Sequence, residues 1–387
     1  MDQLQPVLRF SGFEEGYRNI LFKDIIDNYG YGPRFNANDY SEFGNVKTIR
    51  GTDVSIEGEI KYQQVPTAQL DENTIKTHKL KDGDLVMITT ADCGLTGVFR
   101  QQNIDYIPSA YAVRITLNEK GYPIFFKYFL QTQLAKFQVD KFIRKATVAN
   151  LPGSDILRFS INIPSFPEQT KIATFLSAVD EKLNLLKEKK VALEEYKKGM
   201  MQKIFSQEIR FKDENGKDFE TWEEKTISEI CTKKSSNISA NKIEENFGEY
   251  FIYGASGVLK KIDFYKEEND YVSIVKDGAG VGRLLYCKGK SSVLGTLEII
   301  SPKVNLNTYF LYCLLSNIDF TKYVTGSTIP HIYFKDYSLE KCGLPSLNEQ
   351  TKIANILSAI DEKIALIATQ IEDTQEYKKG LLQGMFC

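Results

Sequence analysis

Two segments of the chain carry apolar residues at alternating steps of four and three positions, interrupted once, at Lys190. In the first segment these residues are Ile172, Leu176, Val179, Leu183, Leu186 and Leu193. In the second segment they are Ile353, Leu357, Ile360, Ile364, Ile367 and Ile371. Such spacing is the a/d seam of a coiled coil, kept here for about three heptads. The pattern predicts two long helices whose seams pack on each other.

The two segments are also copies of one another. A shift of 181 positions places Pro164 on Pro345 and "LSAVDEK" on "LSAIDEK" without a gap. Near the end of the copies stand "EEYKKGMMQKIF" (residues 194–205) and "QEYKKGLLQGMF" (residues 375–386). A repeat of this length indicates an internal duplication.

Each copy opens with Ser-x-x-Glu, at Ser165–Glu168 and at Ser346–Glu349. We interpret this pattern as a capping box at the start of each helix. A helix from Glu168 to Phe205 would be about 57 Å long at 1.5 Å per residue. The alternative is a long core helix in an all-α domain, which the strand-like sequence on either side disfavours.

The remaining residues form two regions of similar length that are rich in Tyr, Phe, Val, Ile and Thr and punctuated by glycine. This composition is typical of β-strands with short connecting turns. The predicted order is a first domain (1–163), a first helix (164–206), a second domain (207–344) and a second helix (345–387).

The two β-rich regions resemble each other at a few positions. Both open with Arg-Phe, at Arg9 and Arg210, and an aromatic residue follows, Tyr17 or Trp222. The segment "ATVANL" (residues 146–151) lies 181 positions before "STIPHI" (residues 327–332). We also align Asp84, Val86, Ile88 and Gly94 with Asp270, Val272, Ile274 and Gly280. These matches indicate that the duplication includes both domains, which have since diverged.

Composition narrows the class of protein only a little. The chain has 387 residues, of which 42% are hydrophobic and 26% charged, with a formal net charge of −2. These values are ordinary for a globular protein of more than one domain. The six cysteines stand singly, which favours free thiols in a reducing compartment. The opening "MDQLQPVLRF" lacks the features of a signal peptide, and no apolar run is long enough to span a bilayer. We therefore expect a cytoplasmic location.

The whole chain resembles the specificity subunit of type I restriction–modification systems. The resemblance rests on "IPSFPEQTKIATFLSAVDEK", "LPSLNEQTKIANILSAIDEK", the two "EYKKG" motifs, the Arg-Phe openings with Trp222, and "GASGVLKKIDFY", "DGAGVGRLLY" and "GSTIPHIYFKDY" in the second half. It implies an α+β fold with two target-recognition domains of mixed α/β fold. It also implies that the repeated helices form an antiparallel coiled coil in a pseudo-two-fold duplication.

The same resemblance implies what the chain does. In this family each domain reads one half of a bipartite sequence in double-stranded DNA, and the coiled coil sets the spacing. The chain is then a non-catalytic subunit that docks two methyltransferase subunits and, in the full complex, restriction/translocase subunits. We expect no metal and no cofactor in this chain, because S-adenosylmethionine, ATP and Mg belong to the partner subunits.

The residues themselves argue against most enzymatic alternatives. The chain has no G-x-x-x-x-G-K-[ST] phosphate loop and no Asn-Pro-Pro-aromatic run for a flipped base. It has two histidines, His78 and His331, which disfavours a His-based metal site or triad. The glycines at positions 278, 280 and 282 lack the G-x-G-x-x-G spacing, so we interpret them as a tight turn. Two other functions stay open: a two-headed scaffold for protein ligands, and a nuclease with an unrecognised carboxylate site.

Reading DNA needs phosphate clamps and donors for base edges, which the loops after strands present from a rigid support. The candidates in the first domain are Thr89, Thr90, Lys141, Arg144 and Thr147. The candidates in the second domain are Lys276, Gly278, Arg283, Ser327, Thr328 and His331. The alternative for any single lysine is a solubilising surface charge.

The repeated helix ends offer a surface for partner subunits. Its predicted residues are Glu195, Tyr196, Lys197 and Lys198 with their copies Glu376, Tyr377, Lys378 and Lys379. A surface that recurs with approximate two-fold symmetry can bind two copies of one partner. The alternative is that "EYKKG" only ends each helix, at Gly199 and Gly380.

Overall fold

The computed structural model of the chain describes residues 5–144, 147–303 and 305–387. It divides into two compact units. The first unit runs up to Leu186 and resumes from Gln370 to Cys387, and the second is Lys187–Thr369. Ala146, the first residue of the "ATVANL" match, lies outside the described residues. Each unit combines one β-rich domain with a part of both long helices.

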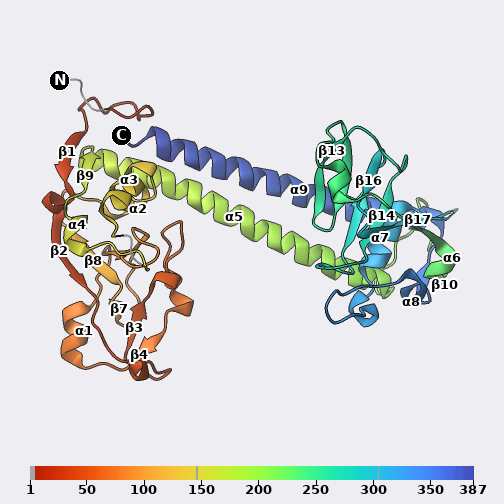
Figure 1. The fold of residues 1–387 in the computed structure, drawn as a ribbon, viewed down its shortest axis with the longest axis horizontal. Coiled ribbons are helices and arrows are strands. Elements are labelled where there is room, and N and C mark those ends of the chain that lie inside the picture. The colour runs from red at the N-terminus through yellow and green to blue at the C-terminus, as the bar shows by residue number, and fades with distance from the viewer. Residues whose placement is uncertain (1–4, 145–146, 304) are drawn as a thin grey trace. The chain divides into compact units, whose positions relative to one another are not determined.

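The repeated segments form the two longest helices, α5 (Phe166–Phe205) and α9 (Leu347–Gly384), as Figure 1 shows. In the first unit the start of α5 packs beside the end of α9. In the second unit the end of α5 packs beside the start of α9. The helices therefore run antiparallel within each unit, and the predicted packing of the two helices on each other is confirmed.

Among its described residues, the first unit contains three small sheets. Strands β1 (Arg18–Leu21) and β9 (Ser160–Ile163) form an antiparallel pair. A four-stranded antiparallel sheet has the order β2 (Ile26–Tyr31), β8 (Ala112–Leu117), β5 (Leu85–Ile88), β6 (Thr96–Val98). A three-stranded mixed sheet has the order β4 (Thr67–Ala68), β3 (Val46–Ile49), β7 (Tyr106–Pro108). The helices are α1 (Glu72–His78), α2 (Pro123–Phe129), α3 (Gln133–Phe142) and α4 (Gly153–Ile156).

The second unit repeats this plan. Strands β10 (Glu223–Thr226) and β18 (Lys341–Leu344) form the antiparallel pair. The four-stranded sheet has the order β11 (Cys231–Ser235), β17 (Leu297–Pro302), β14 (Tyr271–Val275), β15 (Leu284–Cys287). The three-stranded sheet has the order β13 (Gly257–Ile262), β12 (Tyr250–Gly254), β16 (Ser291–Val293). The helices are α6 (Ile227–Ile230), α7 (Thr308–Ser316) and α8 (Phe334–Tyr337).

One detail of the predicted alignment between the domains is wrong. In the first unit Ile88 closes a turn by accepting a hydrogen bond from the Gly94 N–H at 2.8 Å. In the second unit Val275 accepts the same bond from the Gly282 N–H, also at 2.8 Å. Gly282, and not Gly280, is therefore the counterpart of Gly94.

The alignment of β14 with β5 is therefore shifted by one residue. Ile88 corresponds to Val275 and not to Ile274. Every residue of both strands is buried. An alternating apolar pattern normally reveals the register of a strand, and it is missing where both faces are covered. The sequence pattern therefore could not show that the alignment of the two strands was wrong by one residue.

The long helices contribute to the cores of both domains. Ile172 and Leu176 of α5 belong to the core of the first unit, together with Phe125 of α2. Ile353 and Leu357 of α9 take the corresponding places in the second unit. The apolar seam residues at the start of each helix thus pack against both the domain and the other helix. Within the described ranges, no helix is both long and apolar enough to cross a membrane.

Candidate nucleic-acid interface

In the first unit two loops that are distant in sequence are joined by backbone hydrogen bonds. The Ala91 N–H donates to the Ala149 carbonyl at 3.0 Å, and the Leu151 N–H donates to the Thr89 carbonyl at 2.8 Å. Arg144 and Asn150 exchange two further bonds, at 2.9 and 3.2 Å. We call residues 89–95, Arg144 and 147–151 the first loop pair.

The second unit joins its loops in the same way. The Gly278 N–H donates to the Pro330 carbonyl at 2.9 Å, and the Ile332 N–H donates to the Lys276 carbonyl at 3.0 Å. Thr325 and His331 exchange two bonds, at 2.9 and 2.8 Å. We call residues 276–283 and 325–332 the second loop pair. Because the bonds use only the backbone, the frame is common to both units while the side chains differ.

The predicted residues of the first domain gather at the first loop pair, but they are not equally accessible. Arg144 and Thr147 are exposed, and Lys141 is exposed near the end of α3. Thr90 is half-buried, with its hydroxyl 3.4 Å from the Asn150 side chain. Thr89 is only 1% exposed and its hydroxyl donates to the Tyr111 carbonyl. The Thr89 side chain is therefore part of the interior that holds the loop and does not face solvent.

The predicted residues of the second domain all lie in the second loop pair. Ser327 and Thr328 are exposed, whereas Lys276, Gly278 and His331 are half-buried. The His331 ring lies edge-on against Tyr333, with ring centroids 4.9 Å apart.

Arg283 is exposed, but its guanidinium is anchored, because Nη1 donates to the Ala255 carbonyl at 2.9 Å. This bond ties the second loop pair to the turn between β12 and β13.

The three glycines of the second loop pair form a tight turn, as predicted. Gly278, Gly280 and Gly282 have φ angles of +82°, +89° and +84°. Residues that carry a Cβ rarely adopt such angles. A Cβ on Gly282 would lie 2.9 Å from the Cβ of Phe320. The turn places the Arg283 side chain at the surface.

A buried ion pair fastens each domain to its long helix. Arg9 donates to the Glu168 carboxylate through Nε and Nη2, both at 2.8 Å. In the second unit Arg210 donates to Glu349 at 2.8 Å, and the Trp222 Nε1–H donates to the same carboxylate at 3.0 Å. The hydrogen bonds from Arg9 to Glu168 raise the pKa of the Arg9 guanidinium.

Sequence reasoning assigned these glutamates to capping boxes and missed their arginines. The signal was present, because both Arg-Phe openings and both glutamates recur in the two halves.

The glutamine that follows each of these glutamates holds a second connection. In the first unit Gln169 accepts from the Tyr122 N–H at 2.9 Å and donates to the carbonyls of Lys120 and Pro164. In the second unit Gln350 accepts from the Asn307 N–H at 2.9 Å and donates to the carbonyls of Asn305 and Pro345. Buried amides with all their partners are rigid connections, which explains why "EQTKIA" is repeated.

Comparison with known sequences decides the family. Two matches to the sequence model of the type I restriction modification DNA specificity domain cover residues 15–195 and 219–375. The chain belongs to this specificity family.

Related sequences agree with this assignment, and a solved structure shares the fold. The type I restriction enzyme MjaVIII specificity subunit of Methanocaldococcus jannaschii is 29% identical over 197 residues, which cover 46% of each chain. The putative type I restriction enzyme MjaX specificity subunit of the same organism is 27% identical over 285 residues, 66% of each chain. The match thus spans about half to two thirds of these relatives' length. A type-I restriction-modification S subunit from M. genitalium shares the fold, with a TM-score of 0.66 over 99% of both chains at 18% identity.

The repeated "EYKKG" surface of this specificity-family chain is only partly exposed. Glu195, Tyr196, Lys198 and their copies Glu376, Tyr377 and Lys379 are exposed. Lys378 is buried and pairs with Asp180 at 2.6 Å. Lys197 pairs with Asp361 at 2.6 Å in the second unit. These two lysines therefore bind the other helix, and three residues of each copy stay free to face a partner.

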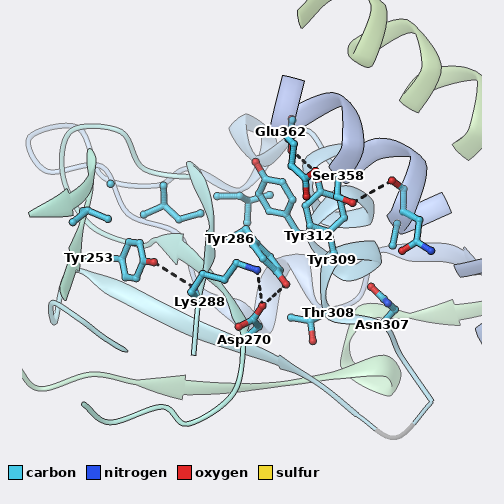
Figure 2. Close-up of a pocket in the computed structure, with 17 residues that line it drawn as sticks. Tyr253, Asp270, Tyr286, Lys288, Asn307, Thr308, Tyr309, Tyr312, Ser358 and Glu362 are labelled. Atoms are coloured by element: carbon cyan, nitrogen blue, oxygen red, sulfur yellow. Dashed lines mark hydrogen bonds and ion pairs between the residues drawn. The ribbon is translucent and has the colours of Figure 1, made fainter. Parts of the chain in front are cut away.

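A groove beside Asp361 in the second unit was not indicated by the sequence. Its volume is about 760 Å³, and Figure 2 shows Tyr286, Tyr309 and Tyr312 grouped along it. Asp270 accepts hydrogen bonds from Tyr286 at 2.6 Å and from Lys288 at 3.1 Å. Carboxylates on its lining make this groove a poor site for phosphate, so we leave it outside the nucleic-acid interface. Among the described residues, no cluster of three or more histidine, cysteine and acidic side chains could hold a metal ion.

Proposed function

We propose that this chain reads a DNA sequence in two separate parts, one with each loop pair. The observation that supports this proposal most is that one backbone frame recurs in both units with different side chains upon it. A frame of this kind holds its loops in a fixed shape and leaves their side chains free to differ. Two such readers in one chain would recognise two different short sequences.

The chemistry of the exposed side chains suits this role. Arginine or lysine can donate to guanine O6 and N7 in the major groove or to a phosphate, and serine or threonine can do either. Exposed members of the loop pairs with this chemistry are Arg144 and Thr147 in the first, and Arg283, Thr325, Ser327 and Thr328 in the second. Each good bidentate contact to a base would discriminate by about 1–3 kcal/mol.

The helices would join the two readings into one. Linking two weak binding modules raises affinity only where both can bind at once, so a rigid spacer would select one distance between half-sites. Two half-sites on one face of DNA lie about 34 Å apart, a helical turn. The buried ion pairs at Glu168 and Glu349 suit this role, because they hold each domain firmly on its helix.

The partners follow from the family. The exposed parts of the two "EYKKG" surfaces would dock two methyltransferase subunits, and restriction/translocase subunits would join in the full complex in the cytoplasm. The chain itself would be non-catalytic. S-adenosylmethionine, ATP and Mg would be bound by those partners.

Methylation mapping tests this proposal. The chain is produced with its cognate methyltransferase subunit in a host without adenine methylation, and modified adenines are read across the genome. We expect one split motif, with two short defined sequences around a fixed gap. A continuous motif would leave one loop pair without a role, and no chain-dependent methylation by an active, bound partner would reject the proposal.

We predict that Arg283→Ala relaxes only one half of this motif. The substitution removes a base or phosphate donor and also the bond to Ala255 that anchors the loop. Discrimination in that half should fall by about 1–3 kcal/mol, that is about 5- to 150-fold, while the other half is unchanged. Competition binding with sequence-changed DNA duplexes measures both halves, and exposed Lys242→Ala is the matched control. Equal losses in both halves would show that Arg283 acts through overall stability.

A further inference from the structure

Each unit presents a largely exposed phenylalanine at the same place in the fold. Phe43 is 92% exposed and lies three residues before β3, and Phe247 is 76% exposed and lies three residues before β12. Strands β3 and β12 are the central strands of the two corresponding three-stranded sheets. A glycine follows each phenylalanine, at Gly44 and Gly248. We call residues 43–44 and 247–248 the Phe-Gly turns.

The backbone allows no other residue than glycine after these phenylalanines. A Cβ on Gly44 would lie 2.3 Å from the Ala68 carbonyl oxygen. A Cβ on Gly248 would lie 2.3 Å from the Ile262 carbonyl oxygen, on the matching neighbour strand. The chain therefore passes in direct contact with its neighbour at both turns.

An asparagine side chain holds each turn in place. Asn45 donates to the Leu70 carbonyl at 2.8 Å and accepts from the Leu70 N–H at 3.0 Å. In the second unit Asn246 donates to the Asp263 carboxylate at 2.7 Å and accepts from the Asp263 N–H at 2.9 Å. Both turns are thus rigid supports that hold an aromatic ring in solvent.

Stability does not explain these rings. Burying a phenylalanine contributes about 1.5–3 kcal/mol, and both units forgo this gain at the same position. Exposed aromatic side chains on rigid supports are the usual anchors of protein interfaces. We infer that the two Phe-Gly turns are anchor points for a protein partner, one copy on each unit.

The surrounding charge favours a protein over DNA. Exposed Glu42 precedes Phe43 in the chain, and exposed Asp71 and Glu72 follow Leu70, to which Asn45 is bonded. Exposed Glu244, Glu245 and Asp263 line the surface around Phe247, and exposed Glu249 follows two residues after it. Around Phe247 these carboxylates outnumber the lysines Lys242 and Lys260, the second of which lies 3.9 Å from the ring centre. Such a surface repels phosphate. It suits an apolar pocket with lysines and arginines on its rim.

The position of the turns supports the same conclusion. Phe247 precedes the start of β12, and the turn that Arg283 contacts follows the end of this strand. The five residues of β12 separate the two places by about 16 Å. In the first unit Phe43 precedes the start of β3. Gly51, beyond the end of β3, lies beside Ile88, and the first loop pair begins at the residue after Ile88. The anchors are thus at the opposite end of the strand from the DNA-reading loops in both units.

This arrangement assigns one partner to the turns. A site that occurs once in each unit fits a partner that binds in two identical copies, and the methyltransferase subunit of the proposed function is such a partner. The inference rests on that proposed function. It adds a contact on the domains to the contact proposed for the helices.

The test compares Phe43→Ala, Phe247→Ala and the double variant with the unchanged chain. Calorimetry measures the affinity and stoichiometry of the methyltransferase subunit for each chain. We expect each single variant to weaken one of two binding events at least about thirtyfold, and the double variant to weaken both. The control is Phe137→Ala, a phenylalanine on α3 that is 75% exposed, about as much as Phe247, and this variant should bind like the unchanged chain.

The other outcomes are equally informative. DNA binding by the free chain should not change, because the rings do not touch the loop pairs. The unfolding midpoint should stay the same for Phe43→Ala, and Phe247→Ala should lower it only slightly, by loss of the contact between the ring and Lys260. Unchanged partner affinity would overturn the inference and leave the proposed function intact. Weaker DNA binding with unchanged partner affinity would assign the turns to DNA instead. If the unchanged chain binds no methyltransferase subunit, the proposed partners and this inference both fail.

Discussion

Replacing Arg210 by leucine is expected to destabilise the second unit by about 3–5 kcal/mol. The Glu349 side chain is 0% exposed and relies on Arg210 for its counter-charge, and the remaining Trp222 N–H is neutral. Breaking a buried ion pair on one side leaves an uncompensated charge, which is far more harmful than removing both charges. Urea unfolding of the purified chain, followed by the fluorescence of Trp222, the one tryptophan, measures this loss.

The double variant Arg210→Leu with Glu349→Gln supplies the control. Glutamine can still accept the Trp222 hydrogen bond but carries no charge, so we expect most of the lost free energy of unfolding to return. If the single and the double variant were equally unstable, packing of the Arg210 stem and not the buried charge would be responsible. The same comparison at Arg9 and Glu168 should affect the first unit.

Replacing Phe386 by alanine is expected to lower the free energy of unfolding of the first unit by about 3–5 kcal/mol. Phe386 is 4% exposed, with its ring centroid 5.1 Å from that of Phe125 and 6.1 Å from that of Phe129. Truncating a buried phenylalanine removes its transfer free energy and leaves a cavity. Chemical unfolding combined with hydrogen exchange measures the loss and locates it in one unit.

A matched pair of variants makes this result specific. Phe205, at the end of α5, packs against Trp222 and Phe310, so Phe205→Ala should destabilise the second unit instead. Phe137→Ala, on an exposed face, should change the free energy of unfolding by no more than about 0.5 kcal/mol. A loss from Phe386→Ala that appeared in the second unit would contradict the packing described here.

The candidate interface was predictable in part. The two loops of each pair were selected because turns after strands present side chains, and the structure brings each pair together. Burial of Thr89 was not predictable, because its hydroxyl bonds to Tyr111, 22 residues away in sequence. The internal roles of Lys197 and Lys378 were hidden for the same reason, since Asp361 and Asp180 are remote along the chain. The Phe-Gly turns were not predictable from the repeat either. The number of positions between Phe43 and Phe247 differs from the shift of 181 that aligns the two helices.

By itself the sequence determined the duplication, the two long helices and their apolar seams, since these depend on spacing within one helix. Only the tertiary structure decided which residues the repeated motifs contact. Glu168 finds Arg9 across 159 positions, and Phe386 enters the core of the first domain instead of the one beside it in sequence. Helical periodicity is a local property and is written in consecutive residues. Ion pairs and core contacts join distant segments, and their partners are set by how the chain folds back on itself.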